Sequence, residues 1–133
     1  MMTTPNYSLD PIGIVRSSLS DAAAAPKQGP EGAPSAWIEL DSRYAAALSG
    51  LATGDQLLLL TWLHQGRRDL LQVHPRDDLN APLLGVFATR SADRPNPIGL
   101  HPVTLLAIEG LRLHVSPLEA VDGTPVLDIK PVI

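Results

Sequence analysis

A stretch near the middle of the chain has the composition of a ligand-binding loop. Residues 85–100 have the sequence GVFATRSADRPNPIGL, in which an apolar segment runs into two arginines, two prolines and an asparagine. Each proline fixes its own φ and restricts the residue before it, so Arg94 and Asn96 are expected in extended conformations with their side chains held in place. Such a rigid loop is suited to holding a ligand. The alternative is that Arg90 and Arg94 pair with surface carboxylates such as Asp93.

The end of the chain combines a turn with a strand that carries two opposite charges. Residues 122–131 have the sequence DGTPVLDIKP, and Asp122-Gly123 is a typical turn pair. Because side chains alternate along a strand, Asp128 and Lys130 are expected on the same face. They would either face a ligand together or form a surface ion pair, which contributes about 0–1 kcal/mol to stability.

Polar residues also follow the longest apolar run, where a buried strand is expected to reach the surface. His64, Gln65 and Gly66 come directly after residues 56–63, and functional loops commonly start in this way. Histidine can accept a proton at neutral pH, so His64 is a candidate base as well as a candidate structural histidine. The other histidines lack the spacing and companions of a metal site, and we expect no metal.

The elements that must position these residues are short strands. Apolar or β-branched segments bounded by turn residues predict strands within residues 7–17, 37–40, 56–63, 70–73, 85–89, 103–109, 111–117 and 126–129. Asp41 can cap one helix that runs through residue 51, and residues 19–35 form a long loop. The uninterrupted run at 56–63 predicts a central strand covered on both faces. No Gly-x-Gly-x-x-Gly follows a strand, so the sequence predicts an all-β protein, a compact β-barrel with one short helix and long loops.

Length and composition indicate a single domain without disulfides. The chain has 133 residues, of which 44% are hydrophobic, 4% aromatic and none cysteine. We expect one aliphatic core, in a domain spanning residues 1–133 with residues 1–6 flexible. No segment reaches the roughly 20 apolar residues of a membrane-spanning helix, and no signal-peptide pattern is present, so a cytoplasmic protein is expected. The net charge of −4 argues against broad binding of a polyanion but not against a local basic patch.

Four separated motifs together resemble the signature of the TsaA-like family, also described as tRNA methyltransferase O. They are IGIVRS at 12–17, LHQ at 63–65, FATRSADRPNPIGL at 87–100 and DGTPVLDIKP at 122–131. The resemblance covers almost the whole chain. It implies a β-barrel that binds S-adenosylmethionine, as a homodimer with each cofactor near the subunit boundary. It also implies a methyltransferase with tRNA as its partner, because characterised members methylate threonylcarbamoyl-adenosine, a modified adenosine next to the anticodon.

The resemblance further implies roles for individual residues. Cofactor contacts carry over to Gln28, Gly29, Pro30, His64, Gln65, Arg90, Leu100, Asp122, Gly123, Thr124 and Pro125. Among these, Asp122 would hold an amino or ribose group, the backbone at Gly123 the carboxylate, and Leu100 would pack on adenine. Substrate contacts are expected at Arg94, Asn96 and Lys130. Methylation of a urea-like nitrogen requires a proton acceptor, for which His64 and Asp128 are the candidates.

Two departures from the family pattern keep other functions open. Family members commonly continue past the Lys-Pro pair with an aromatic residue and, in the best-known bacterial form, with a C-terminal domain. This chain ends at Val132-Ile133, so we expect no accessory domain, and residues 65–85 are less basic than in the pattern. One alternative is a divergent S-adenosylmethionine-dependent methyltransferase acting on a small molecule or a protein, and another is a cofactor-binding module without catalysis. The tRNA function would require a dimer that brings four arginines together in one basic surface. They are Arg67, Arg68, Arg76 and Arg94.

Overall fold

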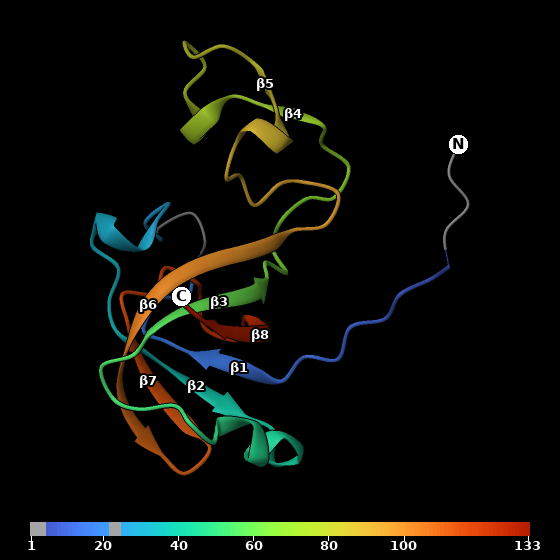
Figure 1. The fold of residues 1–133 in the computed structure, drawn as a ribbon. Coiled ribbons are helices and arrows are strands. Elements are labelled where there is room, and N and C mark those ends of the chain that lie inside the picture. The colour runs from blue at the N-terminus through green and yellow to red at the C-terminus, as the bar shows by residue number, and fades with distance from the viewer. Residues whose placement is uncertain (1–4, 22–24) are drawn as a thin grey trace.

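Six antiparallel strands close into a barrel in the computed structural model, which describes residues 5–21 and 25–133 (Figure 1). The strands are β1 (Gly13–Arg16), β2 (Ala36–Leu40), β3 (Gln56–Trp62), β6 (Ile98–Glu109), β7 (Arg112–Ser116) and β8 (Pro125–Pro131). They follow the order β1-β2-β7-β6-β3-β8, and β8 pairs with β1 to complete the ring. The all-β barrel expected from the sequence is confirmed. Most of the segment expected to be flexible, residues 1–6, lies outside the described residues.

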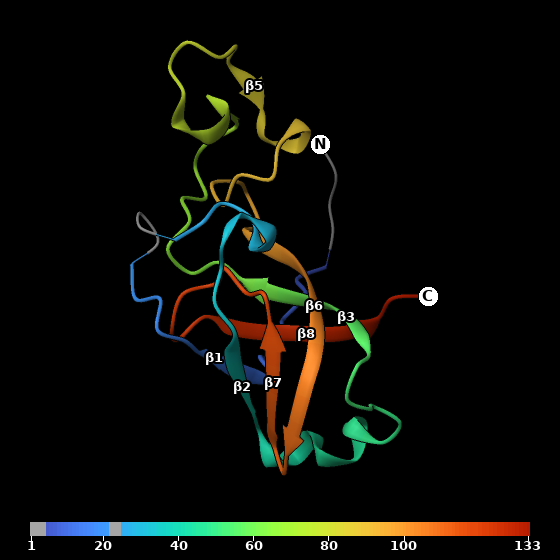
Figure 2. The same cartoon turned by 90° about the vertical axis from the view of Figure 1, so that its left-hand side faces the viewer.

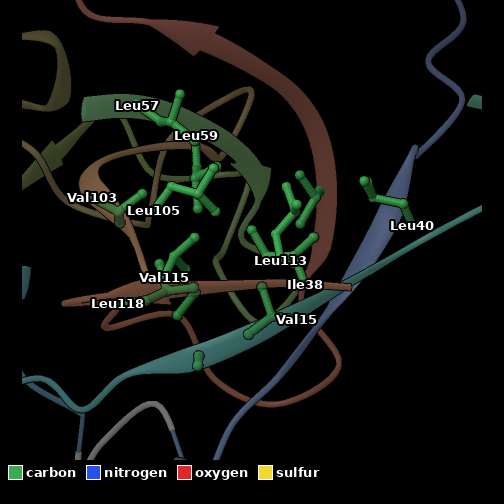
Figure 3. Packing of buried hydrophobic residues seen from close by; sticks show 13 residues of the cluster. Val15, Ile38, Leu40, Leu57, Leu59, Val103, Leu105, Leu113, Val115 and Leu118 are labelled. Atoms are coloured by element: carbon green, nitrogen blue, oxygen red, sulfur yellow. The ribbon is translucent and has the colours of Figure 1, made fainter. Parts of the chain in front are cut away.

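The interior of the barrel is filled by aliphatic side chains that alternate with outward-facing residues along each strand. Leu57 and Leu59 of β3, Val103 and Leu105 of β6, and Leu113 of β7 point into this interior in Figure 3. Complete burial of a side chain of this size contributes about 1.5–3 kcal/mol through the hydrophobic effect. The barrel therefore holds together without aromatic rings in its core.

Strand β3 is covered on one face only, which corrects the prediction of a strand buried on both faces. Its inward residues Leu57, Leu59 and Thr61 are buried, whereas Leu58 and Leu60 on the other face are half-buried. The strand is central, because it pairs with β6 on one side and β8 on the other. A barrel has a single interior, so a strand that is apolar on both faces presents an apolar outer surface.

The helix expected after Asp41 is a short 3₁₀ helix, η2 (Ser42–Leu48). Asp41 caps it as predicted, since its carboxylate accepts a hydrogen bond of 2.9 Å from the backbone N–H of Arg43. Only Tyr44 and Leu48 are half-buried, so the segment has a narrow apolar contact with the barrel and stays short. The helices in the described ranges are all of this short kind, and none has the length and apolar character needed to cross a membrane.

Residues 67–97 form an arm that stands away from one end of the barrel (Figures 1 and 2). The arm contains the strands β4 (Gln72–Val73) and β5 (Leu84–Gly85) and the 3₁₀ turns η3 (Pro75–Asp77) and η4 (Val86–Ala88). The strand expected at 70–73 is thus shorter than predicted, and the one expected at 85–89 is replaced after Gly85 by η4. Leu79 and Phe87 remain exposed, because the described part of the chain provides no layer on which longer strands of the arm could pack.

Candidate ligand-binding site

A pocket of about 870 Å³ opens where the arm meets the end of the barrel. Its walls come from five segments, with lining residues drawn from 25–30, 63–66, 90–96, 98–102 and 119–124. Small-molecule sites typically have volumes of about 300–1,000 Å³, so the pocket can hold a ligand of nucleoside size. The segments are far apart in the sequence and meet because the barrel closes.

Most of the ligand-contacting residues predicted from the sequence line this pocket. They are Gln28, Gly29, Pro30, His64, Gln65, Arg90, Arg94, Asn96, Leu100 and Thr124. The predicted residues that do not line it are Asp122, Gly123, Pro125, Asp128 and Lys130. The structure therefore divides the predicted set between the pocket and two other places, the turn beside it and the outside of the barrel.

The turn at Asp122-Gly123 lies beside the pocket, directly before the lining residue Thr124. The carboxylate of Asp122 accepts a 3.0 Å hydrogen bond from the backbone N–H of Ser17, and the N–H of Gly123 donates to the carbonyl of Val15 at 2.8 Å. Gly123 has a φ of 84°, which favours glycine. These contacts hold the turn against β1 and fix the adjacent wall of the pocket, and they use one oxygen of the Asp122 carboxylate.

Asp128 and Lys130 share one face of β8, as the sequence predicts, and that face is on the outside of the barrel. Lys130 Nζ lies 3.0 Å from Asp128 Oδ2, and strand pairing sets the two residues opposite Leu60 and Leu58. Both charged side chains are about half-exposed, so their attraction contributes about 0–1 kcal/mol. Of the two candidate bases, His64 lines the pocket and Asp128 does not.

Arg90 and Arg94 line the same wall of the pocket but are held differently. Nη1 of Arg94 donates to the carbonyl of Thr89 at 3.1 Å and to that of Ser91 at 3.0 Å, so this side chain shapes its own loop. Arg90 is exposed and makes no hydrogen bond or ion pair with another residue of the described ranges. Within those ranges, neither arginine forms the surface ion pair that the sequence left open. Arg90 is thus a free cation at the pocket.

His64, Gln65 and Asn96 complete the polar rim of the pocket. His64 and Gln65 are exposed, and neither is hydrogen-bonded to another side chain in the part of the chain that is described. Asn96 is oriented by Arg68, whose Nη2 donates to Asn96 Oδ1 at 3.2 Å while its Nε donates to the carbonyl of Pro95 at 2.8 Å. No group of three His, Asp or Glu side chains that could hold a metal ion occurs in residues 5–21 and 25–133.

A buried polar chain forms the floor of the pocket, and the sequence did not predict it. His101 Nε2 lies 2.7 Å from Thr61 Oγ1, and His101 Nδ1 forms a short hydrogen bond with Glu119 Oε1. Gly99 leaves room for this chain, because a Cβ there would lie 2.5 Å from Thr61 Oγ1 and 2.6 Å from His101 Nε2. The sequence offered no such signal, because the strand predicted at 103–109 begins after His101, whereas β6 begins at Ile98.

Two ion pairs tie the arm to the pocket wall formed by the 3₁₀ turn η1 (Gly29–Glu31). Arg76 Nη2 lies 2.6 Å from Glu31 Oε1, and Lys27 Nζ lies 3.2 Å from Asp77 Oδ2; we call these four residues the latch. The hydrogen bond to Arg76 holds the pKa of Glu31 below its ordinary value. Arg76 and Asp77 have φ values of 54° and 56°, in the left-handed region that is uncommon outside glycine. The latch therefore maintains a strained turn beside the pocket.

The chain matches a known family over most of its length. Residues 14–133 fit the family model described as the tRNA-methyltransferase O N-terminal domain. A protein of Archaeoglobus fulgidus named "Probable S-adenosyl-L-methionine-binding protein" is 42% identical over 120 residues, which cover 90% of this chain and 32% of that protein. The "Putative S-adenosylmethionine-dependent methyltransferase RcsF" of Pseudomonas aeruginosa is 41% identical over 133 residues, covering 96% of this chain and 57% of that protein.

The fold is shared with a solved structure. The crystal structure of TrmO from P. aeruginosa superposes with a TM-score of 0.79 at 36% sequence identity, covering 100% of this chain and 57% of that one. The chain thus spans 32–57% of the length of these relatives. All five segments that line the pocket fall within the residues that match the family model. The match to the family model and the shared barrel fold show that the chain belongs to the family of tRNA-methyltransferase O N-terminal domains.

Proposed function

We propose that this protein binds S-adenosylmethionine in the pocket and transfers its methyl group to a nitrogen of threonylcarbamoyl-adenosine, next to the anticodon of tRNA. The observation that carries the proposal is the convergence, in one pocket of about 870 Å³, of segments that resemble the family's cofactor contacts. The family's description as a tRNA methyltransferase and a relative's name as a probable S-adenosyl-L-methionine-binding protein support it.

The pocket offers suitable groups for the main chemical parts of this cofactor. S-Adenosylmethionine carries a carboxylate, an ammonium group, a sulfonium and an adenosine. Arg90 presents a free guanidinium for the carboxylate, and Leu63 and Leu100 provide an apolar surface for the adenine ring. His64 and Gln65 supply hydrogen-bonding groups at the rim. When bound, the cofactor would supply an activated methyl group on its sulfur.

The residues at the rim would position the acceptor and receive its proton. Methylation of the urea-like N–H forms an N–CH₃ bond, breaks the S–CH₃ bond and releases one proton. His64 lines the pocket and is engaged by no other described side chain, so we assign it as the proton acceptor. Arg94 and Asn96 are held by neighbouring groups and would orient the acceptor nucleoside. Much of the rate enhancement then comes from positioning.

We also propose that the protein acts as a homodimer formed through the apolar outer face of the barrel. On the outer side of β6, the side chains of Ile98, Leu100 and Leu106 are 43%, 39% and 41% exposed. The half-buried Leu58 and Leu60 of β3 continue this surface, and apolar patches of this kind commonly mark protein interfaces. Because Leu100 also lines the pocket, a partner on this face would cover the cofactor.

The distribution of charge favours one alternative, a methyl acceptor other than tRNA. The net charge is −4, and two of the arginines expected in a basic surface are engaged: Arg67 lies 2.7 Å from Asp69, and Arg76 lies 2.6 Å from Glu31. Binding of a phosphate backbone gains affinity from cations that displace counterions. With these two arginines engaged, a small-molecule or protein acceptor fits the surface better than a phosphate backbone.

Calorimetry with S-adenosylmethionine tests the cofactor assignment. We expect the wild type to bind and Arg90→Gln to lower the affinity by at least about tenfold, because a charge-assisted hydrogen bond is lost. Arg43→Gln is the matched control, since Arg43 lies on η2 and pairs with Asp41. Equal affinity of Arg90→Gln and wild type would remove Arg90 from the site. Absence of binding by the wild type would overturn the proposed function.

A second experiment tests the acceptor. The protein is incubated with methyl-labelled S-adenosylmethionine and tRNA from cells that lack the gene, and the nucleosides are analysed by mass spectrometry. We expect the label in threonylcarbamoyl-adenosine and a gel shift of tRNA that weakens as salt rises. Cofactor binding without either result would reject tRNA and favour the alternative acceptor.

The latch is expected to influence ligand affinity. Glu31→Gln removes the ion pair with Arg76 and frees the wall at Gly29, so we expect the affinity for S-adenosylmethionine to fall about two- to fivefold at low salt. Added salt screens the pair and should weaken binding by the wild type toward that of the variant. Because the pKa of Glu31 is lowered, the pair persists at neutral pH and is lost as the pH falls through that lowered pKa.

The control for the latch is a similar ion pair that lies away from the pocket. Glu39 is half-exposed and lies 2.6 Å from Arg16, and neither residue lines the pocket. Glu39→Gln should leave the affinity and its salt dependence unchanged. If Glu31→Gln and Glu39→Gln behave alike in titrations at low and high salt, the latch has no effect on the ligand.

A further inference from the structure

The polar chain of Thr61, His101 and Glu119 at the floor of the pocket has no part in the function proposed above. Thr61 is fully buried, and the side chain of His101 is 3% exposed. Glu119 keeps 15% of its side-chain surface exposed and lines the pocket. Of the three side chains, Glu119 is therefore the one that a ligand can contact with a free polar atom.

His101 acts as a positioning residue for this carboxylate. Its Nδ1 bonds to Glu119 Oε1 and its Nε2 to Thr61 Oγ1. Donation through Nδ1 and acceptance of the threonine hydroxyl through Nε2 would satisfy both ring nitrogens. With both sides of the ring engaged, the Glu119 carboxylate is held in one orientation, as in other chains where a buried histidine and a carboxylate fix each other.

The second carboxylate oxygen, Oε2, is left for a ligand. It makes no hydrogen bond to any residue in the described ranges, and a Cβ built on Gly29 would lie 3.1 Å from it. Gly29 and Glu119 both line the pocket, so Oε2 lies close to Gly29 at the pocket surface, and the apolar residues Ala120 and Val121 line the pocket beside Glu119. A largely desolvated negative charge is costly unless it meets a positive one.

We propose that Glu119 recognises the positive charge on the sulfur of S-adenosylmethionine and so distinguishes this cofactor from its product, the uncharged thioether S-adenosylhomocysteine. The inference rests on the proposed function. Asp93, the other carboxylate among the described lining residues, accepts a 2.8 Å hydrogen bond from the backbone N–H of Arg67 and stays with the arm. Glu119 is on the barrel floor and carries the free oxygen.

The consequence for the reaction is a difference in affinity before and after methyl transfer. Transfer removes the positive charge from the sulfur, while the adenosine, ammonium and carboxylate groups are the same in cofactor and product. Attraction between opposite charges is strengthened in surroundings of low polarity. A carboxylate that attracts the sulfonium therefore binds the cofactor and releases the product, whereas contacts to the shared groups hold both equally.

The test compares the two ligands by calorimetry on wild type and Glu119→Gln, which removes the charge and keeps the shape. We expect the wild type to prefer S-adenosylmethionine by at least about tenfold. Glu119→Gln should lose at least about tenfold in affinity for S-adenosylmethionine and less than about threefold for S-adenosylhomocysteine. Glu109→Gln is the control, because Glu109 is exposed at the far end of β6 and should change neither affinity.

Two further variants separate this role from a structural one. His101→Gln should reduce the preference for S-adenosylmethionine while S-adenosylhomocysteine still binds, whereas a merely structural role would weaken both ligands alike. Glu119→Asp keeps the charge and should keep the preference for S-adenosylmethionine over S-adenosylhomocysteine. If melting curves show that Glu119→Gln does not fold, the comparison of Glu119→Asp with the wild type takes its place. Wild type that binds both ligands equally would overturn the proposal.

The outcomes also separate this proposal from the proposed function. If Glu119→Gln weakens both ligands by the same factor, the carboxylate holds a hydroxyl or amino group that the two share, and the sulfonium assignment is wrong. If the variant weakens neither, Glu119 does not contact the ligand. If the wild type binds neither compound, the proposed function itself is wrong.

Discussion

Replacing Gly66 with alanine is expected to lower the affinity for S-adenosylmethionine by at least about tenfold. A Cβ at this position would lie 2.4 Å from the carbonyl oxygen of Ala92 and 3.1 Å from that of Leu63. These neighbours are backbone atoms, so the added methyl group cannot be accommodated by rotating a side chain. The segment that carries His64 must move away from the segment that carries Arg90, and both line the pocket.

Gly85→Ala is the matched control for Gly66→Ala. Gly85 lies in the arm, it has a φ of −60°, and the nearest atom to a built Cβ is the carbonyl oxygen of Leu71 at 3.9 Å. We expect this variant to bind with the affinity of the wild type in calorimetric titrations. Unchanged affinity in Gly66→Ala would mean that the two segments need not touch for the ligand to bind.

Truncating Leu105 to alanine is expected to lower the free energy of unfolding by about 2–5 kcal/mol. Leu105 is fully buried inside the barrel among the side chains shown in Figure 3. Its removal costs the transfer of the lost methyl groups and leaves a cavity, because strands that are hydrogen-bonded on both sides cannot collapse into the space. Total stabilities of domains are about 5–15 kcal/mol, so the loss should be evident in urea denaturation.

Leu106→Ala provides the comparison for this core substitution. Leu106 is the next residue of the same strand, faces outward and is 41% exposed. We expect its truncation to change the free energy of unfolding by less than about 1 kcal/mol in the monomer. Equal losses in the two variants would contradict the assignment of the inner and outer faces of β6.

The barrel could be predicted from the sequence because most of its strands carry a local pattern. The predicted start of β6 was wrong for a reason that depends on its neighbours in the sheet. We expected a strand to begin after Pro102, whereas β6 begins at Ile98 and passes through the proline. From Ile98 to Val103, β6 pairs with β3 alone, since its pairing with β7 starts at Thr104. Proline is tolerated where one side of a strand has no partner.

The extent of burial of a strand could not be predicted from its own residues. The run at 56–63 has the composition of a strand between two layers, and the segment at 85–89 has that of an ordinary strand. Both predictions were wrong, because the residues of a strand do not specify what packs against each of its faces. β3 has the interior of the barrel on one side only, and the residues after Gly85 have no packing layer within the described part of the arm.

The segments of the candidate site could be predicted, whereas the directions of its side chains could not. Proline, glycine and polar residues at 28–30, 64–65 and 90–100 mark loops locally, and these loops line the pocket. The carboxylate of Asp122 is turned toward Ser17 by the pairing of β8 with β1. Asp128 faces outward because of its register with β3, which shifts at an irregularity beside Leu60.

The contact between His101 and Glu119 at the floor of the pocket could not be predicted from the sequence. His101 and Glu119 lie in different elements, and their contact requires β6, β7 and the following loop to be in place. No spacing rule links the two positions. His101 also lay outside the predicted strand, and its inward position follows only from the observed start of β6 at Ile98.

Closure of the ring by β1 and β8 determines when the site can exist. Gly13 pairs with Val126, so the last strand of the domain must return to the first, and contacts between such distant positions form slowly. The pocket walls at 25–30 and 119–124 follow or precede these two strands. A nascent polypeptide still on the ribosome, with every earlier strand made, would not yet capture the cofactor. Ligand binding would therefore report the completion of folding rather than its progress.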